Sequence, residues 1–235
     1  MGVAENLEDV RRRIREAAER VGRDPEEIEL VAVTKNVPVS FIEEAVQSGV
    51  ENIGENRAQE ALKKFQQLGT EINGKKFSWH FVGHLQTNKV RLLIGFIDLI
   101  HSLSSLSLAS EIDKRAGRIG KIQRVLVQVN VAKEKGKFGL DPDSVFEFLH
   151  EIRKLDNLHV EGLMTMPPLF DNPQEARPIF AQFKGLFDQA RSEFTDIPLR
   201  YLSMGMTNDF EIAIEEGSNM VRIGRAIFQE RDEPV

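Results

Sequence analysis

A lysine directly follows the first strongly apolar run of the chain. The run Glu29–Thr34 reads ELVAVT, and Lys35 comes next. A lysine at the end of an apolar strand is partly desolvated, which lowers the pKa of its amine and suits it to Schiff-base formation with an aldehyde. The alternative is a lysine whose stem lies along the strand end while its ammonium group stays in water. Lys35 on its own leaves both interpretations open.

Small and hydroxyl-bearing residues follow two later apolar runs. Ser203, Gly205 and Thr207 belong to the segment YLSMGMTND, and Arg222 and Gly224 belong to MVRIGRAIF. Such residues, placed just before a helix, offer hydroxyls and free backbone N–H groups to an anion. The alternative is that the two glycines only allow tight turns. Combined with a reactive lysine, an anion cradle indicates a phosphorylated carbonyl compound.

Three further polar residues are candidates for the same site. Asn56 follows the second apolar run, where it either caps a helix or points its amide across the site. His84 shares the segment WHFVGHLQTNK with His80, but an intervening glycine and the lack of a nearby carboxylate argue against a metal site. Lys137 closes the basic run Lys133–Lys137, which is either a solvated loop or an electrostatic entry for phosphate.

These residues are spread along an alternation of short β-branched runs and longer amphipathic segments. The runs expected to be strands are Glu29–Thr34, Val50–Ile53, Phe77–Val82, Ile97–His101, Ile122–Asn130, Leu158–Met164, Leu199–Ser203 and Met220–Ile223. Strands separated by helices pair in parallel through right-handed crossovers. Eight such units predict one α/β domain over residues 1–235, a (β/α)8 TIM barrel with an extra N-terminal helix. An open doubly wound sheet is the alternative.

The N-terminal segment predicts that extra helix and not a signal peptide, because it has no apolar core of the required length. One face of the helix is apolar and consists of Leu7, Val10, Ile14, Ala17, Ala18 and Val21. Elsewhere, no stretch approaches the ~20 apolar residues that span a bilayer. We therefore expect a cytoplasmic protein without membrane segments.

Composition excludes several classes of site. The chain has no cysteine, so disulfides, thiolate metal sites and a cysteine nucleophile are ruled out. It has 31 Lys and Arg against 37 Asp and Glu, a formal net charge of −6, which argues against nucleic acid and anionic membranes as partners. It has a single tyrosine, Tyr201, so any tyrosine chemistry must use that residue.

Over nearly its full length the chain resembles the pyridoxal phosphate homeostasis proteins (the YggS/PROSC type), which are similar in fold to the N-terminal barrel of bacterial alanine racemase. The segments that carry the resemblance occur in a fixed order along the chain. They are VAVTK, GEN with a following QE, WHFVGHLQTNK, KFGL, GLMTM, LSMGMTND and MVRIGRAIF. No single segment is specific, but their combination is.

The resemblance implies that pyridoxal 5′-phosphate (PLP) is the cofactor and that Lys35 carries it as a Schiff base. It implies Arg222 at the pyridine nitrogen, Asn56 near the ring substituents and Met164 beneath the ring. The residues implied to hold the phosphate, the last three largely through backbone N–H groups, are Ser203, Gly205, Ile223 and Gly224. Relatives often carry an aromatic residue where this chain has Arg57, which leaves the contact at that edge of the pocket open.

An arginine at the pyridine nitrogen has a chemical consequence. A guanidinium only donates hydrogen bonds, so the nitrogen that it meets is unprotonated and a weaker electron sink than a pyridinium. A racemase of this barrel type needs a second acid–base group on the opposite face of the substrate, and its relatives supply a tyrosine from a second domain. In a chain of 235 residues with Tyr201 as its one tyrosine, we expect that group to be missing.

We therefore expect a PLP-binding protein that buffers or delivers PLP in vitamin B6 homeostasis without robust catalysis. One alternative is a PLP-dependent, racemase-like enzyme of amino acids that uses His84, Lys137 or water as the second base. The other is a Schiff-base aldolase that uses Lys35 without PLP. The partners expected are PLP and PLP-requiring apoenzymes, with the chain itself a monomer or a weak dimer.

Overall fold

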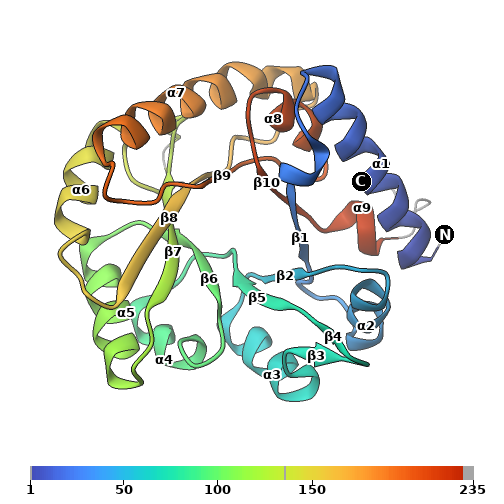
Figure 1. Ribbon diagram of the computed structural model, residues 1–235, viewed down its shortest axis with the longest axis horizontal. Helices are drawn as coiled ribbons and strands as arrows, with labels where there is room; N and C mark the ends of the chain where they lie inside the picture. The colour runs from blue at the N-terminus through green and yellow to red at the C-terminus, as the bar shows by residue number, and fades with distance from the viewer. Residues whose placement is uncertain (1, 135, 230–235) are drawn as a thin grey trace.

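The computed structural model describes residues 2–134 and 136–229. Its main sheet is a closed barrel of parallel strands, in which each strand pairs with the next and the last pairs with the first. In order around the barrel, the strands are β1 (Glu29–Val33), β2 (Asn52–Glu55), β5 (Ser78–Phe81), β6 (Leu99–Leu103), β7 (Gln123–Val129), β8 (Leu158–Thr165), β9 (Tyr201–Ser203) and β10 (Met220–Ile223). The closed barrel is confirmed, and the open sheet is excluded (Figure 1).

Helices surround the barrel and connect its strands (Figure 1). They are α1 (Val3–Arg20), α2 (Val39–Gln47), α3 (Ala58–Leu68), α4 (Val90–Leu93), α5 (Leu106–Arg118), α6 (Val145–Ile152), α7 (Arg177–Glu193), α8 (Phe210–Glu215) and α9 (Arg225–Phe228). Short 3-10 turns at 25–27, 87–89, 142–144 and 173–176 complete the connections. The helix before the first strand is the extra N-terminal helix that the sequence predicts.

The differences from expectation include the start of the second strand and an additional hairpin. The second strand was expected to begin at Val50, but the Val50 N–H bonds the carbonyl of Ala45 at 3.0 Å and so closes α2, and β2 begins at Asn52. A small antiparallel hairpin, β3 (Glu71–Ile72) and β4 (Lys75–Lys76), was not expected. Its turn is Asn73-Gly74 with φ of 50° and 82°, and Asn-Gly is the favoured sequence for such a turn.

Apolar side chains pack in two layers because alternate residues of each strand face opposite sides. The larger layer lies between the strands and the surrounding helices, and includes Phe180 and Phe183 of α7. The smaller layer fills the inside of the barrel with Val31, Val82, Leu99, Leu126, Met164 and Met220. A filled interior confines any site to the two open ends of the barrel.

Helix α1 covers one side of the barrel by packing on α2, α8 and α9. Its apolar face is buried as predicted at Leu7, Val10, Ile14, Ala17 and Ala18. The prediction was wrong for Val21, which is 43% exposed because the helix ends at Arg20.

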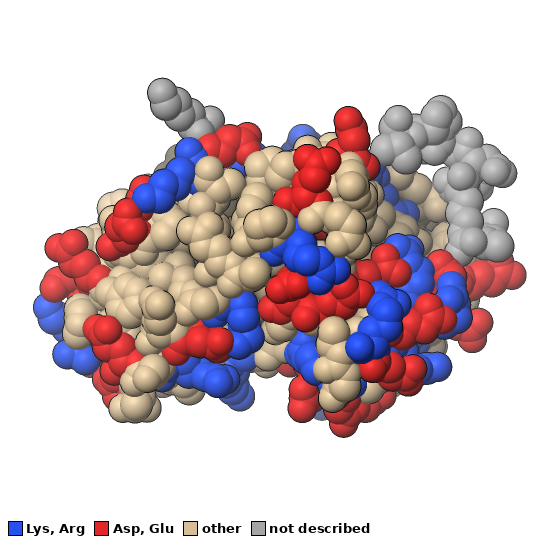
Figure 2. All heavy atoms as spheres, turned by 90° about the horizontal axis from the view of Figure 1, so that it is seen from above, with Lys and Arg blue, Asp and Glu red and all other residues tan. Residues whose placement is uncertain are grey.

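Charged side chains of both signs alternate over the surface. On the face seen in Figure 2, Lys and Arg lie among Asp and Glu and form no continuous basic stripe among the residues drawn in colour. Within residues 2–134 and 136–229, no helix has both the length and the apolar character needed to cross a membrane.

Replacing Leu7 by Ala tests the docking of α1. Leu7 is fully buried, so Leu7→Ala is expected to lower the free energy of unfolding by about 2–5 kcal/mol. The matched control Val21→Ala removes exposed apolar surface and is expected to change it by less than about 0.5 kcal/mol. Urea denaturation of the two variants measures both values. Equal losses would mean that α1 is not docked through this face.

Candidate functional site

A cavity of about 800 Å³ opens at the C-terminal end of the barrel, and we call it the mouth cavity. Its wall includes Val33 of β1 and Arg222 of β10, together with residues of the loops that follow β1, β2, β5, β8, β9 and β10. The sequence-predicted residues that the structure brings together on this wall are Lys35, Asn56, Thr207, Arg222 and Gly224. The wall also contains Met166, Asn208, Asp209 and Arg225, which the sequence argument did not single out.

Lys35 lies two residues beyond the end of β1 and is exposed. The expectation that Lys35 is partly desolvated is therefore corrected, because β1 ends at Val33 and Lys35 reaches into the open cavity. Within the described part of the chain, the Lys35 amine makes no hydrogen bond or ion pair. The amine is accessible and unpaired, which leaves it available to a ligand.

A buried ion pair holds the backbone on one side of Lys35. Lys64 of α3 lies 2.7 Å from Glu55 at the end of β2, and both side chains are almost fully buried. Lys64 also donates to the carbonyl of Thr34 at 2.6 Å, and the Thr34 hydroxyl donates to Glu55 at 2.6 Å. These bonds tie the residue before Lys35 to the neighbouring strand and helix.

The residue after Lys35 is held by the same group of charges. Asn36 has a left-handed φ of 57°, and its N–H bonds Glu60 Oε1 at 2.7 Å. Glu60 is in turn 2.7 Å from Lys64, which lowers the pKa of Glu60 despite partial burial. Because Thr34 and Asn36 are both anchored, the backbone that carries Lys35 is fixed while its side chain is free.

Glu55 is fully buried, and this burial raises the pKa of its carboxyl although Lys64 and Thr34 donate to it. Its second oxygen, Oε2, has no hydrogen-bond partner among the residues described. The charge on Glu55 therefore depends on Lys64.

Asn56 lines the mouth cavity and does not cap α3. Arg57 occupies the position before that helix and makes no capping bond with its side chain. The Asn56 Oδ1 atom is buried and has no hydrogen-bond partner within residues 2–134 and 136–229. A buried amide oxygen without a partner is costly, so this atom is suited to accept a hydrogen bond from a ligand.

Arg222 brings a buried positive charge to the floor of the mouth cavity. Only 3% of the residue is exposed, and this burial lowers the pKa of the guanidinium to about 10, so it stays charged at neutral pH. It donates to the hydroxyl of Ser203 and, at 2.8 Å, to the carbonyl of Thr165. The nearby Asp209 carboxylate acts in the opposite direction and raises the pKa of Arg222. Burial raises the pKa of Asp209 itself.

Three residues of the expected anion cradle, Ser203, Gly205 and Ile223, are not on the wall of the mouth cavity. Ser203 is fully buried and its hydroxyl is taken by Arg222, while Ile223 faces the outer apolar layer from within β10. Gly205 has a φ of 96°, and an added Cβ would lie 2.6 Å from the Ala213 Cβ, so it is needed to pack α8. The cavity wall instead offers Thr207, Gly224 and Arg225.

Met164 also lies away from the wall. It belongs to the apolar layer inside the barrel, together with Val31 and Val82, and is fully buried. The methionine on the wall is Met166. Met166 lies beyond the end of β8 at Thr165, whereas Met164 lies within the strand.

The two remaining candidates lie outside the wall of the mouth cavity. His84 is exposed and stacks on Phe138, with ring centroids 3.6 Å apart. Lys137 pairs with Glu134 at 2.8 Å and reaches the carbonyl of Pro167 at 3.4 Å. Unlike His84, His80 is buried inside the barrel. No group of three or more metal-binding side chains occurs in the described residues.

The pair of Glu55 and Lys64 and the anchoring Glu60 were missed by the sequence argument. The four-residue spacing of Glu60 and Lys64 on a helix was the available signal, since such pairs often interact. Nothing in the sequence shows that Glu55, on the preceding strand, joins them. Asp209 and Arg225 were missed because each becomes part of the wall only when the last loops fold over the barrel end.

The arrangement can hold a small molecule that carries both a carbonyl group and an anion. The Lys35 amine is free to react with a carbonyl, while Thr207, Gly224 and Arg225 offer a hydroxyl, backbone close to α9 and a positive charge. Arg225 also donates to Asn208 at 3.2 Å, which orients its guanidinium at the cavity.

Comparison with known proteins agrees with this geometry. The family described as alanine racemase, N-terminal domain, matches residues 6–232. A pyridoxal phosphate homeostasis protein of Aquifex aeolicus is 44% identical over 231 residues, or 98% of this chain and 99% of that protein. The structure of PipY from Synechococcus elongatus with PLP bound gives a TM-score of 0.83 at 32% identity, covering 96% of this chain and 99% of PipY. An alanine racemase of Clostridium difficile shares the fold, with a TM-score of 0.73 at 18% identity over 99% of this chain and 57% of the racemase.

Removing Lys64 tests whether the buried ion pair supports the cavity. Lys64→Met leaves Glu55 buried without its partner and is expected to lower the free energy of unfolding by about 3–5 kcal/mol. The exposed neighbour Lys63 provides the matched control, Lys63→Met, with a change below about 0.5 kcal/mol.

The loss is expected to depend on pH. Because burial raises the pKa of Glu55 in the folded state, the native protein binds its proton more readily than the unfolded chain does. Stability from this group is therefore full below the unfolded pKa of about 4 and declines as the pH rises through the higher folded pKa. Urea denaturation of Lys64→Met should give a larger loss at about pH 8 than at about pH 5. The opposite order would show that Glu55 is not the group left uncompensated.

Proposed function

The chain belongs to the pyridoxal phosphate homeostasis proteins, within the family of the alanine racemase N-terminal domain, and from this we propose that it binds PLP reversibly in the mouth cavity. The observation that carries the proposal is the free amine of Lys35 on the wall of that cavity. When bound, PLP supplies an aldehyde that forms a Schiff base with an amine and a phosphate that carries negative charge. The protein would hold PLP in this masked form and release it to apoenzymes that require it.

The residues on the wall fit PLP on three counts. The unpaired Lys35 amine suits the aldehyde, and the buried Asn56 Oδ1 without a partner suits a hydroxyl substituent of the ring. Thr207, Gly224 and Arg225 suit the phosphate. An added Cβ at Gly224 would lie 3.0 Å from the Val33 carbonyl, so only glycine leaves the backbone unhindered where the phosphate would lie.

Arg222 would face the ring nitrogen and hold it unprotonated, because a guanidinium has no acceptor. Two of its donors are already engaged by Ser203 and Thr165, which fixes the plane of the guanidinium. An arginine that is buried, charged and held in this way favours binding and orientation over proton transfer.

The placement of Tyr201 supports a holder over a racemase. Tyr201 begins β9 and lines a cavity at the N-terminal end of the barrel, so it lies at the end opposite to Lys35. Apart from Lys35, the acid–base groups that the described residues place on the wall of the mouth cavity are Asp209, Arg222 and Arg225. Asp209 accepts the Met206 N–H at 2.6 Å and balances the charge of Arg222, and an arginine is a poor base.

Substituting Lys35 tests the binding site. Protein loaded with PLP is expected to be yellow, and borohydride should fix the cofactor on Lys35, as mass spectrometry of its peptides would show. Lys35→Ala should lose the visible band, because no other lysine of residues 2–134 and 136–229 lies on the wall of the cavity. Lys137→Ala, in the loop that follows β7, should keep the visible band, because the Lys137 amine is bonded to the Pro167 carbonyl. A visible band retained in Lys35→Ala and lost in Lys137→Ala would overturn the assignment.

Transfer of PLP to an apoenzyme tests the proposed role. Loaded protein is mixed with a PLP-requiring apoenzyme while a trapping agent removes free PLP, and the recovered activity is followed with time. Activity is expected to return faster than with an equal amount of free PLP under the same trap. A return no faster than that of free PLP would reduce the function to buffering.

A further inference from the structure

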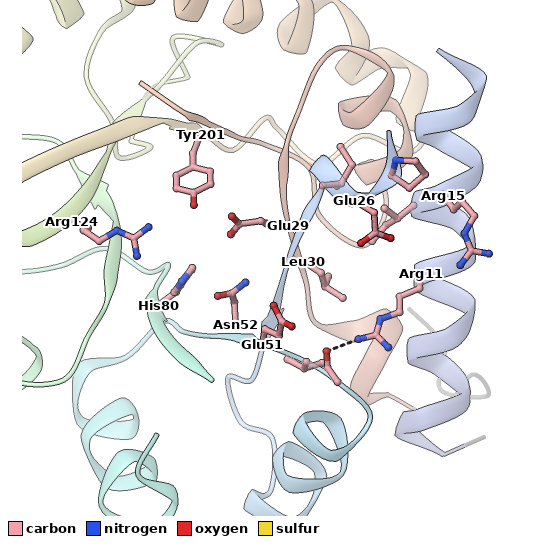
Figure 3. A pocket seen from close by; sticks show the side chains of 15 residues that line it. Arg11, Arg15, Glu26, Glu29, Leu30, Glu51, Asn52, His80, Arg124 and Tyr201 are labelled. Atoms are coloured by element: carbon pink, nitrogen blue, oxygen red, sulfur yellow. Dashed lines mark hydrogen bonds between the residues drawn. The ribbon is translucent and has the colours of Figure 1, made fainter. Parts of the chain in front are cut away.

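A second cavity, of about 570 Å³, opens at the N-terminal end of the barrel, and we call it the base cavity (Figure 3). Five polar side chains from five different strands point toward one another there. They are Glu29, Asn52, His80, Arg124 and Tyr201, the inward-facing residues near the start of β1, β2, β5, β7 and β9. This end of a barrel is usually a packed layer that serves stability, so a cavity with a carboxylate, an amide, an imidazole, a guanidinium and a phenol needs another account.

A chain of buried hydrogen bonds joins the base cavity to the mouth cavity. His80, on the wall of the base cavity, lies 3.1 Å from His101 between Nδ1 and Nε2. His101 Nδ1 lies 3.4 Å from the hydroxyl of Ser203, and Arg222, on the wall of the mouth cavity, donates to that hydroxyl. Every member is buried, so the chain is shielded from water along its length.

The chain has one direction that satisfies all of its members. Arg222 only donates, so the Ser203 oxygen accepts from it and the Ser203 hydrogen is free to be donated to His101 Nδ1. Burial lowers the pKa of His101 well below its usual range and that of His80 to about 3, so both rings are neutral. His101 then donates from Nε2 to His80 Nδ1, and His80 keeps its proton on Nε2, a donor that faces the base cavity.

The base cavity has donor groups on one side and acceptor groups on the other. Arg124 pairs with the buried Glu161 at 2.6 Å, and its charge helps to lower the pKa of His80. The guanidinium of Arg124 and the Nε2 proton of His80 form the donor side. The Glu29 carboxylate points toward Tyr201 and, with the side-chain oxygen of Asn52, forms a side rich in acceptors. Two arginines, Arg11 and Arg15, and two glutamates, Glu26 and Glu51, lie at the rim. A wall that offers both donors and acceptors favours neither a simple anion nor a simple cation.

We propose that the base cavity binds a small zwitterion of the α-amino-acid class, and that its occupancy is transmitted through His80, His101 and Ser203 to Arg222 in the mouth cavity. The carboxylate of the ligand would accept from Arg124 and His80, and its ammonium group would donate to Glu29 and Asn52. A carboxylate on His80 Nε2 strengthens the existing direction of the chain, because each donor in it becomes more polarised. Binding at the base does not depend on PLP, whereas its effect at Arg222 rests on the proposed function.

Calorimetry with the protein free of PLP tests the binding site. Glycine is expected to bind saturably, while acetate and methylammonium, each with one of its two charges, bind at least about tenfold more weakly. Glu29→Gln should weaken glycine binding by about tenfold or more, since it removes the charge that faces the ammonium group. The matched control Glu19→Gln removes an exposed carboxylate of α1 outside the cavity and should leave glycine affinity unchanged.

Three results would overturn the binding site. The first is that glycine does not bind saturably to protein whose melting temperature shows it to be folded. The second is that acetate and glycine bind equally well. The third is that Glu29→Gln leaves the affinity for glycine unchanged. The first leaves water as the content of the cavity, the second makes it a simple anion site, and the third places the ligand elsewhere.

A second measurement tests the connection to Arg222. The probe is N,N-dimethylglycine, a zwitterion whose tertiary amine cannot form a Schiff base with PLP. It is expected to shift the visible band of PLP-loaded protein, and the shift should be lost in His101→Leu and in Ser203→Ala although calorimetry still detects the probe. A loaded protein with a visible band and no shift would overturn the connection. A protein with no visible band under any condition would instead contradict the proposed function.

Discussion

Pairing of β1 with β10 closes the barrel, and the candidate site depends on that closure. The register places Val31 beside Arg222 and Ala32 beside Ile223. The residues that follow these strands, Lys35 and Gly224, therefore meet at one end although they come from opposite ends of the sequence. In an open doubly wound sheet the first and last strands need not be neighbours, and the reactive amine and the phosphate-binding groups would have no common cavity.

Closure alone does not orient Lys35, and the buried charges behind it complete the site. Lys64 joins Glu55, Glu60 and the Thr34 carbonyl, so that one ammonium group from a helix fixes the ends of two strands. An ion pair of this kind contributes little net stability compared with apolar packing, but it is costly to break. Its effect here is geometric, because it holds the backbone on both sides of Lys35 and leaves the amine itself unpaired.

The interior of the barrel has both an apolar and a polar part. The apolar layer around Leu126 and Met164 fills the space between the two cavities. The hydrogen bonds of His101 and Ser203 run between the two cavities and link polar residues at both ends. Burial keeps the imidazoles of His80 and His101 neutral. A neutral imidazole donates from one nitrogen and accepts at the other, so the chain of hydrogen bonds has a defined direction.

The sequence by itself determined the alternation of strands and helices and the residues that follow strand ends, because hydrophobic periodicity and turn residues are local signals. Closure of the sheet into a barrel was decided by the tertiary structure, since it depends on the pairing of the first strand with the last. The sequence identified Lys35, Asn56, Thr207, Arg222 and Gly224, which share the wall of the mouth cavity. Only the tertiary structure decided which way each side chain faces. Ser203 and Met164 lie within strands and are fully buried, whereas Thr207 and Met166 lie in the loops beyond those strands and line the wall. Burial, pairing between distant strands and the meeting of Glu55 with Lys64 are properties of the packed chain, and no local pattern encodes them.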